Sequence, residues 1–379
     1  MRALPSLLLY ILPLCVVSTG WIGVDNVAGV KPSIKRDELF LDFNTSSFIK
    51  NSEYFGPYVV GHTLAGYQLH PHLKYTTTSG ILTKLGVWLQ QDWASPKFFS
   101  KRFPTFTLQY QSGVTTFLIG TLDGIDKHRL LRPLCDGERL LTQMPETGFR
   151  IYHVSETTFV DLWLHWLTVL NKKKEIPEEL LAGLSCEQVI FKASGFTMHL
   201  PLQLMLYHVG GQGIAVKDYS LWMGAIGDCI NFHMSDSSLV KDYSLAGYYV
   251  TNLYVKQPHR AVKRGHGFYG EATCRMAWLK LQLSYWHAYG FNSENFGHPL
   301  YQTYACISTQ AKPQDIYRHL IFLHIIGTYH ITNALTLVLH IDPYYDLKHR
   351  LLEHEAGLYL SYNLSLKLLE LGNNCETSL

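Results

Sequence analysis

Apolar and polar residues alternate over most of the chain, in runs that are separated by turn-forming residues. Phe106, Leu108 and Tyr110 share one face of such a run, which ends at Gln111-Ser112-Gly113, and residues 117–122 form the next run. A period of two places successive side chains on opposite faces of a strand, and a tight turn joins antiparallel neighbours. The pattern therefore predicts an all-β, antiparallel protein.

Runs of this kind continue to residue 368 and predict about twelve to fourteen strands of roughly eight to twelve residues each. Helical periodicity is weak throughout, and no linker, repeat or low-complexity segment divides the chain, so we expect one domain. The segment Leu320–Ile341 has no Asp, Glu, Lys or Arg and is a candidate membrane helix. Histidines and the turn-like Thr332-Asn333 interrupt it, however, and favour two hairpin strands.

The second face of many strands carries Tyr, Trp, His, Gln, Thr and Ser in place of charged residues. Charged residues make up only 16% of the chain, against about 25% in ordinary soluble domains. Transmembrane barrels combine strands of about 9–11 residues with an apolar outer face, a polar inner face and aromatic girdles. We therefore expect a single antiparallel transmembrane β-barrel of the outer-membrane type, with about twelve to fourteen strands.

The chain begins with a pattern typical of export. Arg2 precedes an apolar stretch from Leu7 to Val17, and small residues follow at Ser18 and Gly20. This predicts a signal peptide over residues 1–20. The expected organisation beyond it is an N-terminal extension or plug-like segment at 21–50, the barrel at 51–368 and a polar tail at 369–379.

Charge and cysteine spacing exclude several kinds of partner and cofactor. A net charge of +2 gives no electrostatic basis for binding nucleic acid. The cysteines form no CxxC or CxxH pair, so we expect neither a zinc site nor a redox motif. The expected partner is membrane lipid, with other envelope proteins as further candidates, and no cofactor is expected.

Residues 120–139 contain a dense cluster of charged and histidine residues. These side chains could form a network at the barrel mouth that binds an anion or a sugar. They could equally form a solvated loop, or a charge ladder that ties a plug segment to the wall, and we favour this structural interpretation. The residues are Asp123, Asp126, Lys127, His128, Arg129, Arg132, Asp136, Glu138 and Arg139.

A second candidate lies in the sequence LPLQLMLYHVGGQG at residues 200–213. We expect its leucines to face lipid, Gln203 and Tyr207 to face the lumen, and His208 to mark the interface. Gly210 and Gly211 permit a turn before Gln212, which we retain with His208 as a candidate ligand residue. A lipid hydrolase would need a serine beside a histidine and an acidic partner that orients the histidine.

Ser220 and Ser284 are possible nucleophiles, but a sequence does not show which side chains are adjacent. The motif GxSxG is absent, so we assign no catalytic residue. His287 lies in an aromatic stretch that fits either a sugar-stacking wall or, as we favour, an aromatic girdle. Residues 342–355 contain Asp342, histidines and Glu355, but their spacing matches no metal-binding template, so no metal is expected.

Several of these motifs together resemble a family of uncharacterised outer-membrane-type β-barrel proteins of Bacteroidota. The resemblance implies an outer-membrane barrel and no defined activity. The stretches that carry it are NSEYFGPYVVGHTLAGYQLHPHL (51–73), FLIGTLDGIDKHRLLRPLCDGER (117–139), FVDLWLHW (159–166), LPLQLMLYHVGGQ (200–212), LSYWHAYGFNSENFGHPLYQ (283–302) and HIDPYYDL (340–347).

These observations favour a passive role in the outer membrane, either as a small channel or as a structural or scaffold barrel. The interpretation rests on polar inner faces combined with the lack of a specific catalytic motif. Two alternatives stay open: a membrane-embedded lipid hydrolase or acyl transferase that uses His208 or His287 as base, and an exported carbohydrate-binding β-sandwich. Alternation does not determine the oligomeric state.

Overall fold

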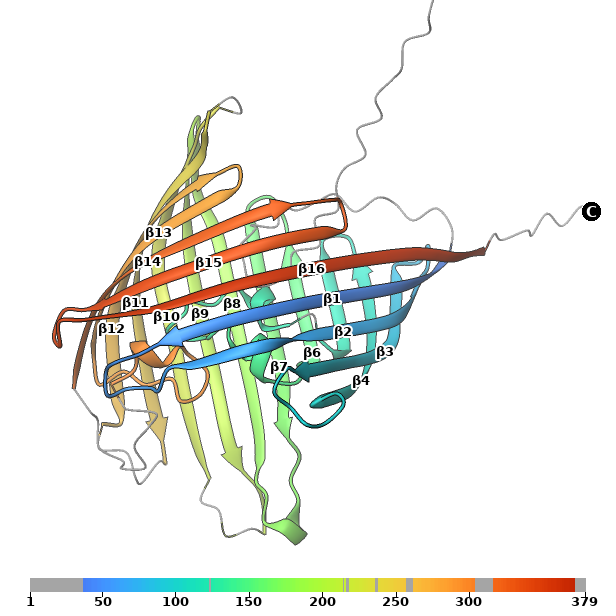
Figure 1. Ribbon diagram of the computed structural model, residues 1–379, viewed down its shortest axis with the longest axis horizontal. Coiled ribbons are helices and arrows are strands. Elements are labelled where there is room, and N and C mark those ends of the chain that lie inside the picture. The colour runs from blue at the N-terminus through green and yellow to red at the C-terminus, as the bar shows by residue number, and fades with distance from the viewer. Residues whose placement is uncertain are drawn as a thin grey trace, which may run out of the picture.

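The strands close into one antiparallel barrel in which each strand pairs with its neighbours in sequence and β1 pairs with β16 (Figure 1). This confirms the predicted fold class, but the barrel has sixteen strands, not twelve to fourteen. The computed structural model describes residues 37–122, 124–213, 215, 218–235, 238–256, 262–303 and 316–371. The predicted signal peptide lies outside these described residues.

The strands range from seven to twenty-one residues, and β5 and β6 are the shortest. They are β1 (Asp37–Glu53), β2 (His62–Thr76), β3 (Ile81–Asp92), β4 (Lys101–Ser112), β5 (Thr115–Thr121), β6 (Thr147–Val154), β7 (Thr158–Thr168), β8 (Glu178–Ala193), β9 (Phe196–Gly210), β10 (Tyr219–His233), β11 (Val240–Val255), β12 (Arg264–Met276), β13 (Leu279–Tyr289), β14 (Tyr317–His330), β15 (Leu335–Asp346) and β16 (Leu351–Leu371). The short helices are η1 (Ile125–His128), α1 (Arg139–Thr142), η2 (Lys172–Lys174) and η3 (Pro299–Tyr301). None of the helices in the described part is long and apolar enough to cross a membrane.

The N-terminal boundary of the barrel corrects a sequence-based expectation. Residues 37–50, which we expected to belong to an extension or plug, are part of β1, so the wall of the barrel already includes Asp37 and does not start at residue 51. The polar run at 44–47 hides the alternation, although Leu41 and Ile49 on either side of it face outward. At the other end β16 continues to Leu371, and the rest of the predicted tail lies outside the described residues.

The two faces of the wall differ in polarity, as the alternation predicts. In β4, Phe106, Leu108 and Tyr110 are exposed on the outside, whereas Thr105 and Thr107 are buried inside. In the same way Leu200 and Leu204 face outward while Gln203 is buried, and the segment Leu320–Ile341 forms a hairpin of β14 and β15. A closed barrel with an apolar outer surface is the form in which β-proteins span outer membranes, and this locates the protein there.

The connections define two ends of the barrel. At one end, which we call the turn end, the strands are joined by two to six residues, and β1 begins and β16 ends there. At the opposite loop end the connections run from four to twenty-seven residues, and the longest are 122–146 and 290–316. Outer-membrane barrels have short periplasmic turns and longer extracellular loops, so the loop end faces the cell exterior.

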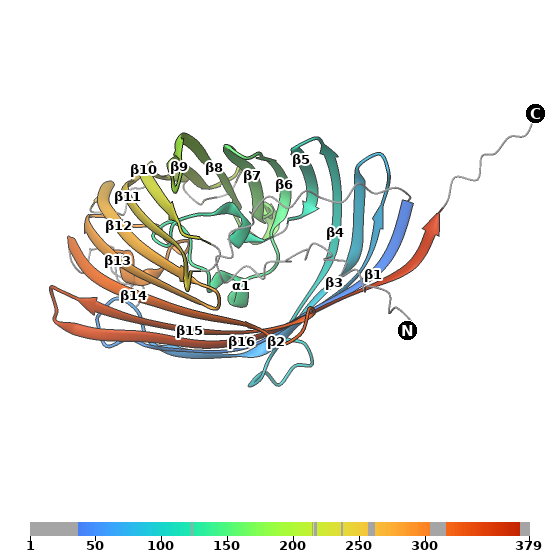
Figure 2. The same cartoon turned by 90° about the horizontal axis from the view of Figure 1, so that it is seen from above.

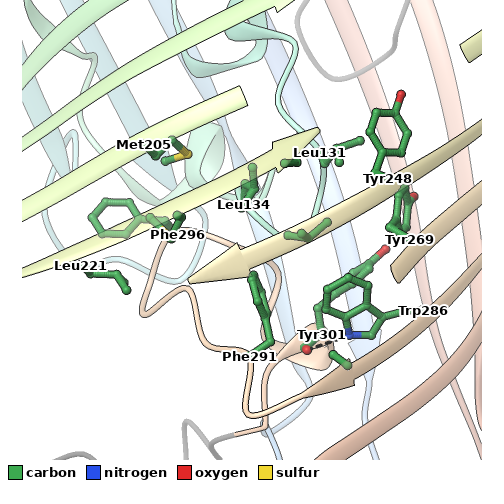
Figure 3. Packing of buried hydrophobic residues seen from close by; sticks show 14 of the residues in the cluster. Leu131, Leu134, Met205, Leu221, Tyr248, Tyr269, Trp286, Phe291, Phe296 and Tyr301 are labelled. Carbon is green, nitrogen blue, oxygen red and sulfur yellow. Dashed lines mark hydrogen bonds between the residues drawn. The ribbon is translucent and has the colours of Figure 1, made fainter. Parts of the chain in front are cut away.

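Segments from the two longest connections fold into the lumen, where α1 lies inside the ring of strands (Figure 2). We call residues 122–146 and 290–303 the plug. Leu134, Phe291 and Tyr301 from the plug pack against inward wall residues such as Met205 and Trp286 (Figure 3). The indole of Trp286 donates to the carbonyl of Tyr301 at 2.9 Å. The lumen therefore contains a packed apolar core.

The outward face of β9 gives a direct test of the membrane-spanning orientation. Leu204→Arg should lower the free energy of unfolding by about 2–4 kcal/mol, because it places a charge on the lipid-facing wall near the middle of the strand. Denaturant unfolding of the barrel inserted in lipid vesicles measures this. Phe98→Arg, in the exposed connection between β3 and β4, is the matched control and should change stability by less than about 0.5 kcal/mol. Equal effects of both substitutions would contradict the orientation.

Candidate functional site

A histidine and a serine form a hydrogen-bonded pair on the outer wall at the loop end. His208 near the end of β9 and Ser220 at the start of β10 are cross-strand partners, and His208 Nδ1 lies 3.0 Å from Ser220 Oγ. Both side chains are half-buried and face outward, since their neighbours Val209 and Leu221 are buried in the lumen. The pair therefore lies on the lipid-facing surface close to the outer rim of the barrel.

The surroundings of this pair on the wall are apolar. Register pairing aligns Trp166 of β7, Leu180 of β8, His208, Ser220 and Val255 of β11 in one row across five strands. Neighbouring strands lie about 4.8 Å apart, so Trp166 stands roughly 10 Å from His208. An aliphatic chain lying across this row would contact hydrophobic side chains on both sides of the pair.

An acidic residue lies beside the histidine. A methyl group added at Gly210 would come within 2.9 Å of His208 Nε2 and 3.2 Å of Asp218 Cβ, so both side chains border this glycine. Lys256 donates to Asp218 at 2.8 Å. This hydrogen bond, with the positive charge of Lys256, lowers the pKa of the Asp218 carboxyl and keeps it ionised. Asp218 thus provides a negative charge on the Nε2 side of His208.

A groove of about 500 Å³ opens in the outer wall where the strands are shortest, and Trp166 connects it to the row that contains His208. Gly120 and Gly148 are partners in this groove with φ values of +103° and +154°. A methyl group at either would lie about 2 Å from a carbonyl oxygen of the adjacent strand, so the groove depends on glycine at both positions. The lining residues are Phe103, Pro104, Phe106, Ile119, Gly120, Thr121, Thr147, Gly148, Phe149, Leu164 and Trp166.

Exposed basic residues lie in the connections at the loop end, on both sides of the pair. We call them the basic rim. Lys172 of the β7–β8 connection reaches toward Gly213 in the β9–β10 connection, and Lys256 follows β11. Anionic headgroups at the membrane surface are attracted to such residues. The basic rim comprises Lys172, Lys173, Lys174, Lys256 and Lys263.

A serine that is hydrogen-bonded to a histidine has the arrangement required for nucleophilic catalysis. The imidazole can accept the hydroxyl proton as the oxygen attacks, and a nearby carboxylate stabilises the imidazolium that results. The sequence points to both residues but not to their contact, which depends on the register of β9 and β10. The sequence pattern does not single out Asp218 or Lys256, although Asp218 stands two residues before Ser220 at the same hairpin end.

His287, the other histidine considered as a base, has a different environment. Its cross-strand partners are Phe268 and His319, and its ring lies 4.2 Å from that of His319. Together with Tyr289 and Tyr317 it borders an aromatic groove of about 390 Å³ on the outer wall. Ser284 lies inside the barrel, where Tyr269 donates to it at 3.2 Å. Of the two histidines considered as a base, His208 is therefore the one with a serine hydroxyl within hydrogen-bond distance in the described part of the chain.

The structure places the charged residues of 120–139 in the plug, where they contact the wall or one another. His128 lies between Asp161 and Glu146 and stacks on Trp163 with a centroid distance of 3.8 Å. Arg129 lies 3.6 Å from Glu187, Arg132 donates to Asp342 at 2.7 Å, and Arg139 donates to the carbonyl of Asn295 at 3.3 Å. The Asp136 carboxylate accepts from the amide of Glu138 at 3.0 Å, Gln212 is exposed in the β9–β10 connection, and Asp123 lies outside the described residues.

Lys50 on β1 joins the plug to the wall through a buried ion pair. Its ammonium lies 2.5 Å from Glu138 of the plug and 3.1 Å from Glu355 of β16, and His62 also contacts Glu138 at 2.9 Å. Burial raises the pKa of the Glu138 carboxyl, but His62 and Lys50 outweigh this effect and lower the pKa to about 2. The stabilising ion pair is thus fully present above the normal glutamate pKa of about 4.5 and is lost as the pH falls through about 2.

Loss of the Lys50 ammonium should loosen the plug. Lys50→Ala leaves Glu138 and Glu355 without this buried cation, which destabilises such sites by about 3–5 kcal/mol. We expect the buried plug thiol Cys135 to react with a maleimide at least about tenfold faster at pH 7, as followed by peptide mass spectrometry. Lys97→Ala, in an exposed loop, is the control. An unchanged labelling rate in Lys50→Ala would show that this network does not hold the plug.

Comparison with solved structures supports the fold. OprD of Pseudomonas aeruginosa is 10% identical, with a TM-score of 0.50 and coverage of 89% of this chain and 97% of that chain. The outer membrane protein OmpT of Vibrio cholerae is 8% identical, with a TM-score of 0.50 and coverage of 87% and 100%. At this sequence distance the similarity concerns the fold alone.

Sequence comparison defines the family. No curated protein is significantly similar to the chain. The model of one protein family, described as "Lipid A 3'-O-deacylase-type", matches residues 31–371 and so spans the whole barrel. The expected resemblance to outer-membrane β-barrels is confirmed. The family description also names an activity, which the resemblance did not imply. The chain belongs to the Lipid A 3'-O-deacylase-type family.

Proposed function

We propose that the protein is a membrane-embedded acyl-ester hydrolase that acts on acylated lipid in the outer leaflet. The observation that carries the proposal is the 3.0 Å contact between His208 and Ser220 on the lipid-facing wall at the loop end. The family description names removal of an O-linked acyl chain from lipid A, and this glycolipid is the substrate we propose. The sequence alone favoured a passive channel or scaffold. We propose instead the lipid hydrolase that the sequence analysis kept as an alternative.

In the proposed reaction Ser220 Oγ attacks the ester carbonyl while His208 Nδ1 accepts the hydroxyl proton. Collapse of the tetrahedral intermediate forms an acyl-serine, and the sugar alcohol leaves with the proton from His208. Water then attacks the acyl-serine with His208 again as base, which releases the fatty acid and restores Ser220. The Asp218 carboxylate supports the imidazolium in both steps, and an alcohol acceptor in place of water would make the reaction an acyl transfer.

Two surfaces beside the pair suit an acylated anionic lipid. The apolar row through Leu180 and Trp166 leads from His208 to the groove, which can take up an acyl chain within the membrane. The basic rim is positioned to attract the headgroup at the membrane surface. A substrate bound in this way would place its ester linkage near the interface, where the pair lies.

The lumen gives less support to a passive channel. Residues of the plug pack against the inward face of the wall, and ion pairs such as Lys50–Glu138 join the two. A cavity of about 180 Å³ borders this network, which is small compared with the pore of an open sixteen-stranded barrel. Conductance measurements in planar bilayers would test the channel directly.

Substitution of either member of the pair should remove the hydrolase activity. Ser220→Ala and His208→Gln are each expected to reduce kcat/KM by at least about 10³-fold, because the nucleophile or its base is lost. The assay measures fatty acid released from lipid A in mixed micelles with detergent-folded protein. Ser284→Ala and His287→Ala serve as matched controls and should retain activity. Activity that survives in folded Ser220→Ala would contradict the assignment of the nucleophile.

Chain-length selectivity should depend on the groove. Ile119→Trp adds bulk to its lining and should lower kcat/KM for a sixteen-carbon ester about tenfold relative to a ten-carbon ester, because the longer chain loses apolar contacts. Leu245→Trp, on the outer wall of β11 away from the groove, is the control. If both variants kept the wild-type ratio of the two rates, the acyl chain would not occupy the groove.

A further inference from the structure

Three buried side chains on the inner face of the wall form a compact cluster of nitrogen and oxygen ligands. His324 lies on β14, and His340 and Asp342 lie on β15, with exposed fractions of 1%, 4% and 0%. Their ligand atoms all lie within 4.8 Å of one another. His324 Nδ1 is 2.9 Å from Asp342 Oδ2, and His340 Nε2 is 2.7 Å from the same oxygen.

The hairpin brings these residues together. Ile325 pairs with Ile341, so the preceding residue His324 faces Asp342 across the two strands. His340 precedes Asp342 by two positions and shares its inward face. The three side chains therefore sit on a rigid wall element and do not depend on a loop for their arrangement.

Hydrogen bonding leaves much of this cluster unsatisfied. Neither nitrogen of His324 has a hydrogen-bond partner in the described part of the protein, because the 2.9 Å contact of Nδ1 lacks hydrogen-bond geometry. His340 Nδ1 and Asp342 Oδ1 are likewise buried without a partner there. Buried polar atoms in folded proteins are almost always paired, so four such atoms in one cluster indicate a ligand.

We propose that His324, His340 and Asp342 bind a divalent transition-metal ion such as Zn²⁺. Two imidazoles and one carboxylate form a set that favours a transition metal over Mg²⁺ or Ca²⁺, which prefer oxygen ligands. The free Asp342 Oδ1 can serve as the carboxylate ligand. The site is separated from the proposed hydrolase pair, since it faces the lumen on other strands, and it does not rest on that proposed function.

Arg132 of the plug is the competing cation at this site. Its guanidinium donates to Asp342 Oδ2 at 2.7 Å and to the phenol of Tyr344 at 3.0 Å, and it lies 3.3 Å from His340 Nε2. A bound dication would be repelled by this charge and would compete with it for Asp342. Metal binding is therefore coupled to the contact between the plug and the wall.

Isothermal titration of the detergent-folded full chain with Zn²⁺ tests the proposal. We expect one high-affinity site in the wild type, at least about tenfold weaker binding in His324→Ala and in Asp342→Asn, and tighter binding in Arg132→Gln. Tighter binding on removal of a neighbouring positive charge is not expected from nonspecific damage to the fold. Ca²⁺ and Mg²⁺ should give no binding at this site.

His319→Ala is the matched control, because His319 lies on the same strand but on the outer wall. It should leave the high-affinity site unchanged, and heat-modifiable gel mobility should show that every variant is folded. If His324→Ala does not fold, His324→Gln replaces it. Absence of Zn²⁺ binding in folded wild type and Arg132→Gln, or unchanged binding in the His324 variant, would overturn the proposal.

Discussion

Lipid cannot form hydrogen bonds with a polypeptide backbone, and this constraint governs the whole molecule. Each strand must pair on both sides, so the sheet has to close, and the closing ladder joins β1 with β16 along the full length of β1. Closure then divides the side chains into two environments. Outward positions such as Leu204 and Phe106 meet lipid, whereas inward positions such as Thr105 and Gln203 meet the lumen.

The polar inner wall needs partners, and the plug supplies many of them. Gln203 donates to the carbonyl of Arg129 and accepts from the amide of Leu131, both at 2.9 Å. Arg150 of β6 and His128 of the plug meet on the carboxylate of Asp161. The lumen thus combines its apolar core with a network of polar contacts between plug and wall. This arrangement leaves the outer rim as the surface where a membrane lipid can meet reactive side chains.

Alternation revealed the barrel because the polarity of its two faces repeats along nearly every strand. It failed at β1, where the polar run at 44–47 interrupts the pattern. Side-chain contacts were harder to predict, because they depend on register. His208 and Ser220 lie almost equally far from their hairpin connection, as do His324 and Asp342. Residues placed in this way face each other across an antiparallel hairpin, so their spacing could have indicated both contacts.

The closing ladder also has a kinetic consequence. Thr45 of β1 contacts the carbonyl of Tyr362 across 317 positions of sequence, so the first strand waits for the last one before its free edge is paired. Contacts of such long range slow folding, and unpaired edges promote aggregation while they persist. The partly folded barrel would therefore present two unpaired edges until β16 has paired with β1. Its assembly should require cellular factors that hold the unfinished sheet apart from other chains until β16 arrives.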